Sequence, residues 1–298
     1  MQIFKDFSLS TITAGFVASL VGLTSGIVIV FEAARAVGAS DKQIASWVFA
    51  LCLGMAILTI VPSLKLRIPV MVAFSAPGAA ILATVAPGDF TLSEAVGAFV
   101  INGVLMAFVG FSGLFERFMN RIPVALVSAL LAGVLARFVL SGFADAETAP
   151  GLIAITSLVY MVTRRFAPRY AVVAVLVAGI TTSLASGSIR TEELTLAFAQ
   201  PEYVGPSFSL SAVIGLAIPL FIVTMAGQNL PGVAALRNAN YDAPISKVIG
   251  STGLGTVLLA PFGGYAFNLS AVSAPICLEA SAHEDPARRY TAALSNGG

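Results

Sequence analysis

Long apolar stretches separated by short polar ones dominate the hydrophobic pattern of the chain. A helix needs about 20 apolar residues to cross the hydrocarbon core of a membrane, and most of these stretches approach that length. The pattern therefore predicts an all-α polytopic membrane protein. In chain order, we place ten helical segments at Thr11–Val37, Ile44–Val61, Ala76–Val85, Leu92–Phe115, Ile122–Phe143, Pro150–Val162, Tyr170–Ser186, Phe208–Gly227, Ala243–Ala260 and Leu269–Ala280.

The tenth segment is short and follows a cluster of residues that break helices. Pro261–Gly264 precede an extended run at Tyr265–Phe267, and Asn268 and Ser270 then lead into the apolar half. Irregular backbone at membrane depth is tolerated only where protein or a water-filled cavity satisfies its N–H and C=O groups. A broken helix of this kind points to the binding site of a transporter.

The third segment repeats this arrangement. Ala73 and Phe74 precede Ser75 and an apolar helix, as Ala266 and Phe267 precede Asn268. We expect the extended parts, about Val70–Phe74 and Tyr265–Phe267, to form short strands that cross near the membrane centre. Phe74 should then lie close to Phe267.

A longer internal duplication supports this pairing. Shifting the chain by 201 positions superimposes two helices without a gap. Seven segments per copy is an odd number, so the second copy is inverted relative to the first. The sequence therefore predicts a 7+7 inverted-repeat transporter fold with broken helices 3 and 10, of which this chain covers about helices 1–10. The matched pairs include Phe7 with Phe208, Gly26 with Gly227, Ala33 with Ala234, Asp41 with Asp242, Ile44 with Ile245 and Gly54 with Gly255.

Composition and charge exclude several classes of protein. The chain of 298 residues is 57% hydrophobic and only 10% charged, whereas soluble domains carry about 25% charged residues. A net charge of +1 gives no reason to expect a nucleic-acid partner. The single histidine, His283, and the two separated cysteines, Cys52 and Cys277, offer no metal site. We expect no cofactor, and neither a nucleophile–base pair nor a ligand set favours an enzyme.

Basic residues in the short loops predict the orientation of the chain. They gather on one side of the predicted segments, and acidic residues such as Asp89 and Asp145 fall on the other. Because Lys and Arg are enriched in cytoplasmic loops, we expect a multi-pass protein of the cell inner membrane with a cytoplasmic N-terminus. The basic residues are Lys65, Arg67, Arg117, Arg121, Arg164, Arg165, Arg169, Arg237, Lys247, Arg288 and Arg289.

Three motifs in the second half resemble the benzoate membrane transporter (BenE) family: Thr224–Arg237, Ala260–Ser270 and Asp285–Thr291. The resemblance implies import of benzoate with protons, and a fourteen-helix fold shared with nucleobase transporters. In that fold a core domain of helices 1–4 and 8–11 moves against a gate domain of helices 5–7 and 12–14. The resemblance divides this chain into residues 1–115 (core), 116–200 (gate) and 201–298 (core, incomplete), with helices 11–14 expected beyond it.

Neutral polar residues at the broken helices are the candidates for substrate binding. Nucleobase transporters of this fold tend to carry a glutamate in helix 8, where this chain has Gln228 and Asn229. A glutamate would repel an anion, whereas amides can donate to a carboxylate. The alternatives are that the amides join helices, the serines cap them and the aromatic rings pack. The full candidate set is Gln228, Asn229, Asn268, Ser75 and Ser270 for the carboxylate, and Phe74, Phe267 and Tyr265 for the ring.

Glu32 is the candidate for proton coupling because intramembrane carboxylates are usually functional, although an ion pair with Arg35 explains it equally well. The expected partners are a benzoate-like molecule, protons and the lipid bilayer, and a homodimer is a further candidate. A nucleobase or inorganic-anion permease of the same fold is the alternative function. A membrane-embedded enzyme or structural subunit is the alternative from another class.

Overall fold

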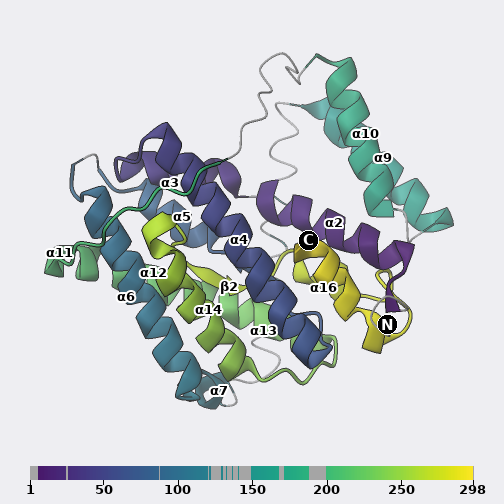
Figure 1. Cartoon of the computed structure of the whole chain (residues 1–298). Coiled ribbons are helices and arrows are strands. Elements are labelled where there is room, and N and C mark those ends of the chain that lie inside the picture. Colours follow the sequence, from purple (N-terminus) through teal and green to yellow (C-terminus); the bar gives the residue numbers. More distant parts are fainter. Residues whose placement is uncertain are drawn as a thin grey trace.

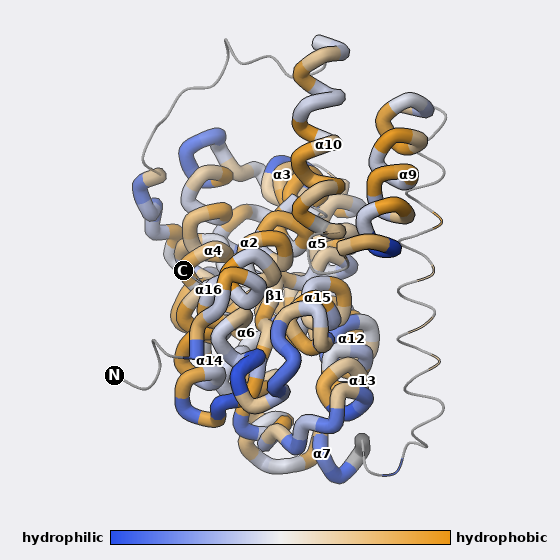
Figure 2. Tube along the Cα trace, turned by 90° about the vertical axis from the view of Figure 1, so that its right-hand side faces the viewer, coloured by the Kyte–Doolittle hydropathy of each residue, from blue (hydrophilic) through white to orange (hydrophobic). Residues whose placement is uncertain are grey.

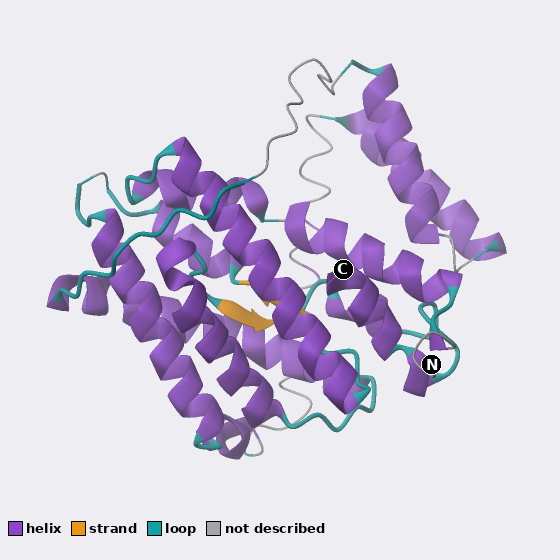
Figure 3. Ribbon diagram, viewed as in Figure 1, coloured by secondary structure: helices purple, strands orange, loops and turns teal. Residues whose placement is uncertain are grey.

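The computed structural model describes residues 6–24, 26–86, 88–119, 121, 129, 132, 136, 140, 149–167, 171–187 and 199–297. The predicted helix Ile122–Phe143 lies almost entirely outside these residues. In the described part, helices surround a single pair of short strands (Figure 3). Five helices are long and apolar enough to cross a membrane. Hydrophobic residues run along most of the helices, and hydrophilic ones gather at turns such as the one beside α7 (Figure 2).

In its described residues, the first half of the chain forms six helices around strand β1, followed by a separate helix pair. In order, these are α2 (Leu9–Thr24), α3 (Ile27–Ala36), α4 (Asp41–Leu66), β1 (Val72–Phe74), α5 (Ala76–Ala83), α6 (Leu92–Phe111), α7 (Leu114–Met119), α9 (Pro150–Phe166) and α10 (Ala171–Ala185). Side-chain caps fix two helix starts: Ser40 with Gln43 at α4, and Thr91 with Glu94 at α6, each form a reciprocal capping box.

The second half repeats the order of a long helix, a second helix, a strand and a half-helix. Its elements are α11 (Leu210–Ala212), η4 (Val213–Ala217), α12 (Ile218–Thr224), η5 (Met225–Asn229), α13 (Leu230–Asn238), α14 (Ile245–Leu259), η6 (Ala260–Phe262), β2 (Phe267–Leu269), α15 (Ala274–Leu278), η7 (Pro286–Arg288) and α16 (Tyr290–Gly297). The stretch from α11 to α13 is helical throughout, with two π-helical turns at η4 and η5.

Three predicted boundaries are wrong. The first segment is two helices, because Gly26 lies in a turn and begins α3 as its N-cap. The eighth does not end at Gly227 but continues to Asn238, since a π-turn absorbs the irregularity there. The tenth half-helix begins at Ala274 instead of Leu269, because Leu269 still belongs to the strand. The chain also starts a further helix, α16, which the predicted segments omit.

Small residues let the long helices approach closely. A Cβ on Gly103 of α6 would lie only 2.8 Å from the backbone nitrogen of Val257 in α14. A Cβ on Gly15 of α2 would lie 2.3 Å from the carbonyl oxygen of Ala292 in α16. Membrane helices associate through such close packing because lipid removes the hydrophobic driving force between them. These contacts build one body around the strands, while the α9–α10 pair stands apart and contacts α2 (Figure 1).

Candidate functional site

Strands β1 and β2 cross in the middle of the helical body. They run antiparallel, and Val72 faces Leu269, Ala73 faces Asn268 and Phe74 faces Phe267. The predicted strand pair and the proximity of Phe74 to Phe267 are therefore confirmed. Hydrogen bonds extend the pairing at both ends, from Ser75 N to Ala266 O at 3.0 Å and from Ser270 N to Met71 O at 2.9 Å. The pairing fixes the two half-helix starts relative to each other.

Hydroxyl groups satisfy the outward-facing N–H groups of the strands. Thr59 Oγ1 in α4 accepts from Val72 N at 3.0 Å. Thr256 Oγ1 in α14 accepts from Phe267 N at 3.1 Å. Each strand is thus held by the helix that precedes it in its own half of the chain. An orphaned buried N–H costs about as much as a lost hydrogen bond, so these threonines make irregular backbone tolerable here. Neither threonine is among the residues predicted from the sequence.

Serines define the start of each half-helix. Ser75 Oγ accepts from Gly78 N at 3.1 Å and caps α5. Ser270 Oγ accepts from Ser273 N at 3.1 Å and lies 2.7 Å from Ser273 Oγ. These bonds hold Ser270 in the link before α15, which begins at Ala274. Among the described residues, the N–H groups of Ala271 and Ala274 have no hydrogen-bond acceptor, although both residues are buried.

The two adjacent amides of η5 have different surroundings. Asn229 is fully buried, and its Oδ1 accepts from Leu269 N on β2 at 2.9 Å. Gln228 retains 8% exposure, and its amide has no hydrogen-bond partner within the described part of the chain. Single π-turns inside α-helices are frequent at functional sites. The geometry makes Asn229 a support for the strand and leaves the Gln228 amide free to bind a ligand.

Asn268 also forms its hydrogen bonds within the protein. With its amide oxygen turned toward Ser75, it accepts from Ser75 N at 3.0 Å and donates to Leu269 O at 3.0 Å. The residue is completely buried. It therefore joins the two broken segments, a role that the sequence does not distinguish from substrate binding.

Tyr265 sits at the centre of an aromatic cluster. Its ring centroid lies 5.9 Å from that of Phe99, 6.2 Å from that of Trp47 and 6.5 Å from that of Phe74. Its hydroxyl donates to Ser75 O at 2.9 Å. Asn102 of α6, which was not among the predicted residues, donates to Tyr265 O at 3.0 Å. The structure thus encloses Tyr265 on all sides as a packing and linking residue.

The remaining aromatic candidates pack against glycines. Phe267 is fully buried, and its ring occupies the space that a Cβ on Gly54 would fill. Phe74 fills the corresponding space at Gly26, the N-cap of α3. A cavity of about 290 Å³ borders the strand crossing, where Val72, Gly22 and Ser273 form part of its wall. Glu32 lies on an exposed part of α3, outside this crossing.

Two half-helices that begin at crossed strands inside a body of membrane-length helices are the arrangement of transporters with broken helices. The chain belongs to the BenE family of benzoate membrane transport proteins, whose sequence profile matches residues 5–298. It is therefore a multi-pass membrane transporter, not an enzyme. This result confirms the resemblance seen in the helix-8 and helix-10 motifs.

Two curated relatives agree with this assignment. The inner membrane protein YdcO of Escherichia coli (strain K12) is 42% identical over 287 residues, covering 96% of this chain and 73% of the relative. The benzoate membrane transport protein of Acinetobacter baylyi (strain ATCC 33305 / BD413 / ADP1) is 34% identical over 293 residues, covering 98% and 74%.

A solved structure shows the same fold. The transmembrane domain of a cyanobacterium bicarbonate transporter, BicA, superimposes with a TM-score of 0.55 at 17% identity. The match covers 97% of this chain and 79% of that domain. The predicted fold class is thereby confirmed.

Proposed function

We propose that the protein imports benzoate or a related aromatic carboxylate by proton symport across a bacterial inner membrane. In this proposal the N-terminus is cytoplasmic, and the two halves of the chain are inverted repeats. Residues 1–115 and 201–298 form the core, and residues 116–200 belong to the gate. Membership of the BenE family and the name of the Acinetobacter relative support the substrate class.

The character of the buried polar groups carries the proposal. In the part of the chain that the structure describes, the buried polar side chains other than the tyrosines and the tryptophan are all Ser, Thr, Asn or Gln. No buried carboxylate is therefore present there to repel an anion, a repulsion of about 4 kcal/mol at 4 Å in a medium of intermediate polarity. Uncharged donors can hold a carboxylate, and those near a helix N-terminus gain from the helix dipole.

We divide the candidate residues by their surroundings. The Gln228 amide and the free N–H groups of Ala271 and Ala274 bind the carboxylate in this proposal, next to the hydroxyls of Ser270 and Ser273. The supporting residues keep those donors in place, and the buried rings of Phe74 and Phe267 make the surroundings of the strand crossing apolar. The supporting residues are Asn229, Asn268, Ser75 and Tyr265.

Transport into proteoliposomes tests the proposal. We expect vesicles containing the purified protein to accumulate radiolabelled benzoate faster than protein-free vesicles when the interior is alkaline, and to lose this difference when a protonophore removes the gradient. Unlabelled benzoate should compete, whereas uracil and bicarbonate should not. Uptake of labelled uracil or bicarbonate by a protein that does not transport benzoate would instead establish a nucleobase or inorganic-anion permease. Benzoate transport that does not respond to the gradient would support benzoate as the substrate and exclude proton symport.

A further inference from the structure

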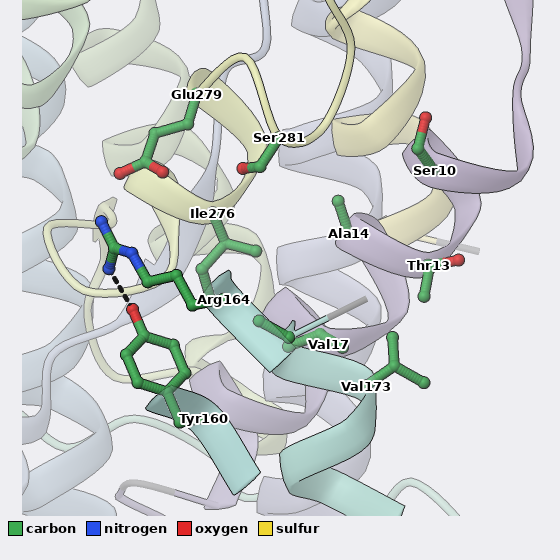
Figure 4. Close-up of a pocket in the computed structure, with 11 residues that line it drawn as sticks. Ser10, Thr13, Ala14, Val17, Tyr160, Arg164, Val173, Ile276, Glu279 and Ser281 are labelled. Atoms are coloured by element: carbon green, nitrogen blue, oxygen red, sulfur yellow. Dashed lines mark hydrogen bonds between the residues drawn. The ribbon is translucent and has the colours of Figure 1, made fainter. Parts of the chain in front are cut away.

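A second cavity lies between the helical body and the α9–α10 pair. It has a volume of about 260 Å³, and its wall combines residues of α2, α9, α10 and the end of α15 (Figure 4). An apolar cavity of about 150 Å³ accommodates benzene, so this space has room for an aromatic ring with a carboxylate. It does not include any of the residues assigned above to substrate binding.

The cavity contains two opposite charges. Among the described residues of its wall, the charged ones are Arg164 of α9 and Glu279, which follows α15. Figure 4 shows both side chains extending into the same part of the cavity. The Arg164 guanidinium packs 5.5 Å over the ring of Tyr160 and donates to the Tyr160 hydroxyl. This contact orients the guanidinium, and a cation over an aromatic face is also favourable in itself.

The remaining wall suits an amphipathic anion. Ile276 and Val17 give it an apolar side, while Ser10 and Ser281 contribute hydroxyl groups. Ile276 lies one helical turn after Ser273, and Glu279 lies almost two turns after it. The cavity therefore borders the middle of half-helix α15 and the segment that follows the helix.

We propose that this cavity is a second binding station for the aromatic carboxylate, between the strand crossing and the mouth of the transporter on the Arg164 side. Arg164 binds the carboxylate, since its guanidinium matches the two oxygens. Glu279 repels the same anion and limits how long it stays. The inference rests on the proposed transport of an aromatic carboxylate, and it adds a site that the broken helices do not contain.

Two substitutions that replace a charged side chain by a neutral amide test the opposite roles. Arg164→Gln should raise the KM for benzoate presented from the Arg164 side about three- to tenfold, because a charge-assisted bond is lost at a partly solvated site. Glu279→Gln should lower that KM by a smaller factor. Arg165→Gln is the matched control, because Arg165 carries the same charge on the same helix but is not part of the cavity wall.

The measurements use inside-out and right-side-out vesicles containing the complete protein at equal amounts. Only the KM for benzoate presented from the Arg164 side should change. Arg164→Lys should have a KM between those of the wild type and Arg164→Gln. Equal effects of Arg164→Gln and Arg165→Gln, or shifts of the same sign in Arg164→Gln and Glu279→Gln, would overturn the second station. Absence of benzoate transport by the wild-type protein would overturn both this station and the proposed function. If the wild-type protein transports benzoate and the variants keep the wild-type KM, the second station is excluded and the proposed function stands.

Discussion

The hydroxyl of Tyr265 donates a hydrogen bond of 2.9 Å to the backbone carbonyl of Ser75. Tyr265 precedes β2, and Ser75 caps α5, so this bond ties the second broken segment to the start of the first half-helix. The carbonyl of Tyr265 in turn accepts from Asn102 at 3.0 Å. One residue thus connects both broken segments to α6. We infer that the two half-helices move together as one rigid unit.

Removing that hydroxyl should destabilise the protein. Tyr265→Phe leaves the ring packing intact but removes one of two donors to the buried Ser75 carbonyl, which keeps its bond from Ala79 N, at a cost of about 0.5–1.5 kcal/mol. The change is measured as a lower unfolding temperature of the detergent-solubilised protein. Tyr241→Phe is the control, because the Tyr241 hydroxyl donates to Pro286 O at 2.8 Å in an exposed setting. Equal decreases of the unfolding temperature in the two variants would show that the buried bond to Ser75 O stabilises the protein no more than the exposed bond to Pro286 O.

Gly263 and Gly38 both have a positive φ, of 101° and 83°, but differ in the space around them. A Cβ on Gly263 would lie 1.9 Å from Trp47 Cδ1, whereas none of the described atoms lies within 4 Å of a Cβ on Gly38. Gly38→Ala should therefore cost only the backbone term, about 1–2 kcal/mol. Gly263→Ala should cost about 1–3 kcal/mol more through overpacking. Comparing unfolding temperatures tests the order, and a Gly263 variant as stable as the Gly38 variant would contradict it.

The sequence was sufficient to predict the strand crossing. The repeated Ala-Phe pair and the flanking helix breakers place Phe74 and Phe267 correctly. Helix breakers at corresponding positions of two apolar segments indicate a pair of broken helices. Long apolar runs likewise predict most helices. The split of the first helix was not predicted, although Gly26 aligns with Gly227 in the π-turn of the duplicated helix.

The hydrogen-bond partners of the site could not be predicted, because they depend on tertiary geometry. Thr59 and Thr256 resemble any threonine in an apolar helix, yet each supports a strand. Asn229 and Gln228 are adjacent in sequence, but the π-turn gives only Asn229 contact with the Leu269 N–H. The sequence identified the polar positions near the crossing and could not separate supporting groups from free ones.

Glu32→Gln should uncouple transport from protons if Glu32 carries them. The variant keeps the size of the side chain but cannot titrate. We expect benzoate uptake to lose its response to an imposed pH gradient, while exchange of external for internal benzoate remains near the wild-type rate. Asp41→Asn, an exposed change in the first turn of α4, is the control. A Glu32→Gln protein that still accumulates benzoate with the gradient would exclude this carboxylate as the coupling residue.

The adjacent amides of η5 should separate stability from binding. Asn229→Leu removes the acceptor of the Leu269 N–H, leaving a buried donor unpaired, and should cost about 1–3 kcal/mol of stability. Gln228→Leu removes no described hydrogen bond, so its unfolding temperature should stay near that of the wild type. The same change deletes a donor to the substrate carboxylate and should raise the KM for benzoate about tenfold or more. The measurements are the unfolding temperature and the KM for benzoate of each variant. An unchanged KM in a folded Gln228→Leu protein would place the carboxylate elsewhere, and an unaltered stability of Asn229→Leu would mean that the bond to Leu269 does not hold the strand.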